Sequence, residues 1–195
     1  MQYLKYIAAL TILISVPGEA NELLECGSNE QAQELVRLIL NDEHQRRSSM
    51  QCSSVLIEVA EDKVEIMANH GLVMHNLGGS PNQRLRNAGF ELPKYYGTFM
   101  ANQVEAVAGG YSSAEKVWRA FKQSEHHRKH LLGEHPVYLK QDKIGVAFIR
   151  KNDSPHVEYW AVYLTEGSGD DNEQFDDVPN KGIDMLTPTS ENENK

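Results

Sequence analysis

Two apolar segments joined by a polar loop decide the fold: KIGVAFI at residues 143–149, RKNDSPH at 150–156 and VEYWAVYL at 157–164. The apolar segments are rich in β-branched and aromatic side chains, which favour β-strands. The loop contains Asn, Asp, Ser and Pro, which are typical of turns. These residues are therefore predicted to form an antiparallel β-hairpin late in the chain.

Helix signals fill most of the chain before this hairpin. Ser28 and Gln31 have the spacing of a capping box, and apolar residues then recur on one helical face. VEAVAGG at residues 104–110 predicts a shorter strand or an ordered turn, and Ser124 is expected to cap the last helix. Four or five helices with a small antiparallel sheet indicate an α+β domain. The further helices are predicted at residues 56–71, 80–89, 112–121 and 124–133.

Composition and charge are those of one ordinary domain with a tail. Hydrophobic residues make up 40% of the 195 residues and charged residues 24%. The segment from Gly167 to Lys195 carries −6 of the net charge of −9, so the remainder is close to neutral, which argues against a nucleic-acid-binding surface. Residues 166–195 have no apolar period and are predicted to form a disordered acidic tail.

The first residues have the features of a secretory signal peptide. One lysine precedes an apolar run of 11 residues, and Gly18 and Ala20 put small residues three and one before a cut. Cleavage is predicted after Ala20, so that residues 21–165 form the domain. An uncleaved signal stays open because Glu19 is unusual there. A membrane anchor is disfavoured, since a bilayer span needs roughly 20 residues. We expect a secreted or periplasmic protein without stable membrane insertion.

Export changes what the two cysteines imply. Cys26 and Cys52 are the only pair in the chain, and an even count in an oxidising compartment favours a disulfide. Two buried free thiols are the alternative. A zinc site is disfavoured, because no histidine lies near either cysteine at a zinc-binding spacing.

A histidine cluster raises the first functional question. SEHHRKHLL at residues 124–132 could be a solvated basic patch, a metal-binding site, or one functional histidine with two neighbours that have no role. With Ser124 as the cap, His127 lies in the first helical turn, where the helix dipole disfavours imidazolium. A neutral imidazole binds metal or accepts a proton. On spacing alone, a His127 that is satisfied by backbone groups is the more frequent outcome.

Two further candidates lie outside this cluster. His75 follows an apolar run and precedes a glycine pair, where the backbone can approach a ligand closely. Glu105 is a single acid in a stretch of small and apolar residues, so it is either an edge-strand charge or a buried functional carboxylate.

The order of the motifs resembles the CAP superfamily of cysteine-rich secretory proteins, antigen 5 and pathogenesis-related proteins. Within it, the chain is most similar to the compact bacterial SCP-domain branch. The resemblance covers about residues 30–165 and implies a three-layer α-β-α sandwich. The motifs that carry it are, in order, LILNDEHQRR, VLIEVAEDKVEIMA, LVMH, SPNQRL, NAGF, VEAVAGG, AFKQSEHHRKHLL, IGVAF and YWAVYL.

The resemblance also assigns the site. His75 matches the histidine of the family's Phe-Ser-His, Glu105 the glutamate of Glu-Asn-Ile-Ala, and His127 the histidine of Ser-Pro-Gly-His-Arg. Ser124 matches a motif position that looks structural and is included among the ligand-binding candidates. Ala106 and His130 stand where the family has asparagines, so two expected hydrogen bonds around the site are missing.

Two functions follow from these residues. The first is a binding module in which His75 and His127 hold zinc or another divalent cation weakly, and the groove takes a lipid, a peptide or another envelope ligand. The second is a metal-assisted extracytoplasmic hydrolase in which Glu105 activates water. The chain has no HExxH motif and no nucleophile elbow, so whether it is an enzyme stays open.

Overall fold

The computed structural model describes residues 26–97 and 101–167. The predicted signal peptide lies outside the described residues, as does the predicted acidic tail from residue 168 onward. The elements are, in chain order, α2 (Glu30–Leu40), β1 (Gln51–Cys52), α3 (Ser54–His70), α4 (Pro81–Asn87), β2 (Glu105–Gly109), α5 (Ala114–Gln123), α6 (Glu125–Leu131), α7 (Pro136–Leu139), β3 (Lys143–Arg150) and β4 (Glu158–Thr165).

The hairpin predicted from the sequence forms the centre of the sheet. Strands β3 and β4 pair antiparallel along their whole length, from Lys143 opposite Thr165 to Arg150 opposite Glu158. Strand β2 pairs antiparallel with β4, and the strand order is β1-β3-β4-β2. The two-residue strand β1 pairs parallel with β3 and makes the sheet mixed. The predicted α+β class is confirmed.

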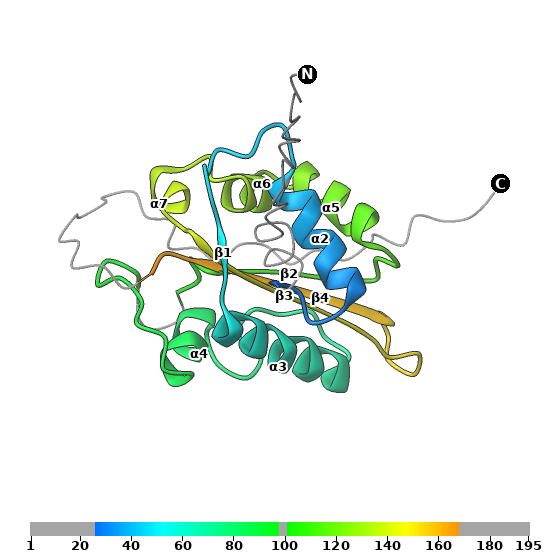
Figure 1. Ribbon diagram of the computed structural model, residues 1–195. Helices are drawn as coiled ribbons and strands as arrows, with labels where there is room; N and C mark the ends of the chain where they lie inside the picture. The colour runs from blue at the N-terminus through cyan, green and yellow to red at the C-terminus, as the bar shows by residue number, and fades with distance from the viewer. Residues whose placement is uncertain (1–25, 98–100, 168–195) are drawn as a thin grey trace, which may run out of the picture.

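Helices cover both faces of this sheet (Figure 1). Helices α2, α5 and α6 lie on one face, and α3 and α4 lie on the other. Because side chains alternate along a strand, β4 supplies both cores. Its alternate residues divide between the α2/α5 core, which takes Trp160, Val162 and Leu164, and the α3/α4 core, which takes Tyr159, Ala161 and Tyr163.

Local capping explains where most of the helices begin, with some departures from the predictions. Helix α2 is capped by Asn29, whose Oδ1 accepts a hydrogen bond from the Ala32 N–H at 3.2 Å, and not by Ser28. Ser124 stands at the N-cap of α6, but its side chain makes no capping hydrogen bond because it contacts a histidine instead.

Gly145 is needed in β3, since a Cβ there would lie 2.4 Å from the Leu56 carbonyl carbon of α3.

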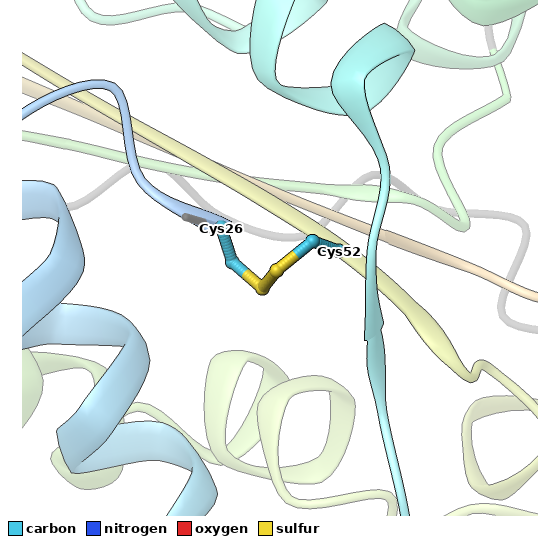
Figure 2. Close-up of a disulfide and its surroundings, with 2 residues drawn as sticks. All are labelled: Cys26 and Cys52. Atoms are coloured by element: carbon cyan, nitrogen blue, oxygen red, sulfur yellow. A yellow bond between two sulfur atoms is a disulfide. The ribbon is translucent and has the colours of Figure 1, made fainter. Parts of the chain in front are cut away.

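The predicted disulfide between Cys26 and Cys52 is confirmed, with Cα atoms 4.7 Å apart. Figure 2 shows it joining the segment before α2 to strand β1. It therefore ties the beginning of one helical layer to the strand from which the chain enters the other.

The end of the domain reaches slightly beyond the last strand. The Tyr95 hydroxyl donates a hydrogen bond to the Glu166 carboxylate, and the Gly167 N–H donates to Asp142 Oδ1 at 3.1 Å. Across residues 26–97 and 101–167, none of the helices has the length and hydropathy of a membrane span.

Candidate functional site

His75 and Glu105 are in direct contact, although 30 residues separate them. His75 lies in the loop between α3 and α4, and Glu105 is the first residue of β2. The His75 Nδ1 atom is 2.7 Å from Glu105 Oε1. The carboxylate is fully buried, whereas 11% of the His75 side chain is exposed, so His75 is the member of the pair nearer the surface.

The other oxygen of Glu105 is also engaged. Its Oε2 accepts a hydrogen bond from the Tyr163 hydroxyl, the residue directly opposite Glu105 on β4. The Lys63 ammonium of α3 lies 3.8 Å from the same oxygen, too far for a hydrogen bond but close enough for a strong electrostatic attraction. Both Glu105 oxygens therefore have protein partners.

These contacts keep Glu105 ionised in a buried position. Burial alone would raise the pKa of Glu105, but the charge of Lys63 and the hydrogen bonds from His75 and Tyr163 together lower it. Burial raises the pKa of Tyr163, and the neighbouring carboxylate raises it further, so the hydroxyl stays a donor. Because an ionised carboxylate accepts only, His75 carries its proton on Nδ1 and points Nε2 elsewhere.

Asn102 fixes the backbone around this pair. Its Oδ1 accepts hydrogen bonds from the N–H groups of Val104 and Glu105, at 3.2 and 2.8 Å. Its Nδ2 donates to the Glu105 carbonyl at 2.9 Å and lies 3.2 Å from His75 Nδ1. Since that Nδ1 donates to Glu105, we interpret the 3.2 Å approach as a packing contact.

The histidine cluster separates into exposed and buried members. His126 is exposed, whereas His127 and His130 are fully buried. The His127 Nδ1 lies 2.9 Å from the Ser124 hydroxyl, and its ring packs on Phe121 with the ring centres 5.0 Å apart. Burial lowers the pKa of His127 to about 3, with smaller contributions from the charges of His75 and His126. His127 is therefore neutral at physiological pH.

The two candidate histidines belong to opposite layers of the domain. His127 belongs to α6 on one face of the sheet, and His75 follows α3 on the other. Glu105 lies on the edge strand β2, and its side chain is on the same sheet face as Tyr163, the face that α3 and α4 cover. The charge of His75 makes a small contribution to the lowered pKa values of His127 and His130, behind the larger effect of burial.

Several ring nitrogens at this place have no protein partner. Among the residues that the structure describes, no hydrogen-bond partner is found for four buried ring nitrogens: Nε2 of His75, Nε2 of His127, and both ring nitrogens of His130. Burial lowers the pKa of His130 well below its usual range, as does the charge of Arg47. Within residues 26–97 and 101–167, no three His, Cys, Asp or Glu side chains gather closely enough to hold a metal ion. A cation here would have two imidazole ligands, His75 and His127, and complete its shell with solvent or ligand atoms.

A hollow lies elsewhere on the domain. It measures about 500 Å³ and lies between α2 and α5, where Trp118 and several charged side chains line it. Some of its acids and bases pair with one another, as Lys122 Nζ does by donating to Asp42 Oδ2 at 2.8 Å. None of the predicted site residues lines this hollow.

Lys63, Asn102 and Tyr163 complete the surroundings of the site, and none of the three was predicted from the sequence. A signal existed for Lys63, which lies four residues before Met67 and three after Ala60 on the apolar face of α3. Tyr163 gave no such signal, because its contact with Glu105 depends on the register of β4 against β2.

Comparison with known proteins identifies the class of fold. No family model matches the chain, and no curated protein matches it in sequence. Two solved structures are similar. An outer surface protein from Borrelia burgdorferi gives a TM-score of 0.53 at 17% identity, covering 69% of this chain and 90% of that one. An extracellular protein containing an SCP domain, from Bacillus anthracis str. Ames, gives 0.52 at 17% identity, covering 70% of this chain and 40% of that one.

These similarities concern the fold alone. The domain has an α+β fold similar to that of an SCP domain, which agrees with the fold that the order of the sequence motifs predicted. The chain matches less than half the length of the Bacillus protein, so the activity and partners of that protein do not transfer with the fold.

Proposed function

We propose that the protein is an extracytoplasmic binding protein that uses His75 and His127 to hold a divalent cation and, beside it, a small ligand of the cell envelope. The location is supported by the confirmed disulfide, which belongs to an oxidising compartment, and by the predicted signal peptide. The two similar structures are described as an outer surface protein and an extracellular protein, which agrees with this location.

One observation carries the proposed site: the unpartnered Nε2 atoms of His75 and His127. A buried polar atom without a partner is costly, so each of these two nitrogens favours a ligand that would satisfy it, and the proposal assigns both to one ligand. Neutral imidazole nitrogens are preferred ligands of zinc and related cations. With only two protein ligands, binding is weak, and open coordination positions remain for a lipid headgroup, a peptide or another envelope component.

The state of Glu105 favours binding over hydrolysis. A carboxylate that activates water needs a free oxygen directed at that water. Both Glu105 oxygens contact protein groups, namely His75, Tyr163 and Lys63. The proposed role of Glu105 is therefore to orient His75, as carboxylates commonly do for metal-binding histidines.

Calorimetric titration of the mature protein with zinc tests this proposal. We expect one site that is lost in His75→Ala and in His127→Ala, and that is unchanged in His126→Ala. His126 is the matched control because it is adjacent to His127 but exposed. Absence of zinc binding by the wild type, or full binding by the two alanine variants, would overturn the proposal.

The ligand is tested by native mass spectrometry of protein purified without chelators. A bound lipid or peptide is expected on the wild type and not on a His75→Ala/His127→Ala double variant. If the protein instead turns over an envelope substrate, and Glu105→Gln abolishes turnover while zinc stays bound, the hydrolase replaces the binding module.

A further inference from the structure

A fully buried lysine lies directly behind the candidate site. Lys63 is in the middle of α3, on the face that packs against the sheet, and none of its side chain is exposed. Lysine is seldom fully buried, because moving an ammonium out of water is costly unless its charge and its hydrogen bonds are satisfied. Its contacts therefore indicate what this lysine does.

All three N–H donors of the Lys63 ammonium are used on one loop. Nζ donates to the carbonyl oxygens of Met74, His75 and Leu77, at 2.6, 2.7 and 3.3 Å. Three acceptors match the three donors of a charged ammonium, whereas a neutral amine has only two. Arg84 of α4 donates to the Leu77 carbonyl as well, at 2.8 Å. The loop that carries His75 is thus bound from two helices.

The same ammonium balances the charge of the carboxylate that orients His75. Lys63 Nζ is 3.8 Å from Glu105 Oε2, and both side chains are fully buried. An attraction between opposite charges is strong in such a place because water does not screen it. Burial lowers the pKa of Lys63, and the Glu105 carboxylate opposes this shift.

We infer that Lys63 is a positioning residue of the proposed site: through three loop carbonyls and the charge of Glu105 it holds the His75 ring with Nδ1 on Glu105 and Nε2 toward the ligand. The inference rests on the proposed function, because His75 is the group that meets the ligand. Lys63 itself contacts neither the ligand nor the cation.

Side-chain NMR tests this inference without any metal. Long-range ¹H–¹⁵N spectra at neutral pH, with chelator, report which ring nitrogen of each histidine carries the proton. The wild type is expected to show His75 as a single tautomer with the proton on Nδ1. Lys63→Met removes the charge and the three donors, and we expect signals from both tautomers. If that variant does not fold, Lys63→Gln replaces it, since glutamine keeps N–H donors but has no charge.

Arg47→Met is the matched control. Arg47 is another buried cation that donates to backbone carbonyls, but those it contacts belong to the α6 and α7 segments and not to the His75 loop. Its loss should leave the His75 tautomer unchanged. An unchanged His75 signal in the Lys63 variants would overturn the inference, and so would the same disturbance in Arg47→Met.

Zinc titration then separates this inference from the proposed function. Lys63→Met should raise the zinc dissociation constant about 10- to 100-fold, the usual cost of losing a residue that supports a metal ligand. His127→Ala should lose zinc but keep the His75 tautomer. If the wild type binds no zinc while the tautomer depends on Lys63, the proposed function fails and the positioning role is supported.

Discussion

Each of the two helical layers contains a buried cation, Arg47 beside His130 and Lys63 beside the loop of His75, and the two cations are satisfied differently. In the α6 layer, Arg47 donates to the carbonyls of His130, Leu131 and Tyr138, at 2.7, 2.9 and 3.0 Å. Burial lowers the pKa of Arg47 to about 10. In the α3 layer, Lys63 also donates to three carbonyls but has the Glu105 carboxylate beside it as well.

This difference corresponds to the way each histidine is held. His75 is bound by a charged acceptor in an ion-paired network, whereas His127 contacts the neutral Ser124 hydroxyl. Hydrogen bonds to charged groups are about twice as strong as neutral ones. The α3 layer therefore holds His75 mainly by electrostatic interactions, whereas the α6 layer holds His127 mainly by burial and packing.

The largest effect is expected for Glu105→Gln, which leaves Lys63 buried without its counter-charge. The free energy of unfolding in urea should fall by about 3 kcal/mol, a usual cost of removing one partner of a buried ion pair. Glu158→Gln is the control, because its partner Arg150 is half exposed and the pair should contribute less than about 1 kcal/mol. Equal losses of stability in the two variants would mean that the buried pair of Lys63 and Glu105 stabilises the protein no more than the half-exposed pair does.

Reduction of the disulfide comes next. Opening the bridge between Cys26 and Cys52, which are 26 residues apart, should lower the free energy of unfolding by about 3 kcal/mol or somewhat less. The bridged segment contains Arg47 and not Lys63. Amide hydrogen exchange with and without reductant should therefore show faster exchange in α6 than around His75. If reduction instead accelerated exchange around His75 more than in α6, the two layers would not be held separately as described above.

Acid should destabilise the protein through His127. The unfolded chain protonates this residue near pH 6.5, but the folded protein does so only near pH 3. Protonation thus favours the unfolded state, and the free energy of unfolding falls as the pH decreases below 6.5. In the presence of chelator, His127→Gln should reduce this slope by about 1 kcal/mol per pH unit. The two slopes are compared between about pH 6.5 and 5, because carboxylates titrate mainly below this range. An identical slope in the variant would show that His127 is accessible to protons in the folded state.

The smallest effect is expected for Ser124→Ala. Losing one neutral hydrogen bond should lower the free energy of unfolding by about 1 kcal/mol or less. The NMR signals of His127 should change, because its Nδ1 loses its partner. Ser113→Ala is the control: it removes the side-chain cap of α5, at a similar cost in stability, and should leave the His127 signals in place. An unmoved His127 signal in Ser124→Ala would show that burial alone orients this ring.

Much of the fold could be predicted because its signals are local. The β-branched and aromatic runs of β3 and β4, the apolar face of α3 and the proline at the start of α4 each depend on neighbouring residues. The disulfide followed from a single pair of cysteines. The capping residue of α2 was predicted one position too early, at Ser28 instead of Asn29, because both residue types cap helices well.

The sequence by itself determined the α+β class, the order of the longer helices and of strands β2 to β4, and the histidines and acid worth testing, since these depend on residue types and short spacings. Strand β1 and helix α7 were not predicted. Only the tertiary structure decided that Lys63 balances the charge of Glu105 and that the Tyr163 hydroxyl donates to the same carboxylate. It also decided that His127 and His130 are buried while His126 is exposed. Those outcomes depend on strand register and on the packing of two layers around one edge strand. They are contacts between residues far apart in the chain, which no local pattern records.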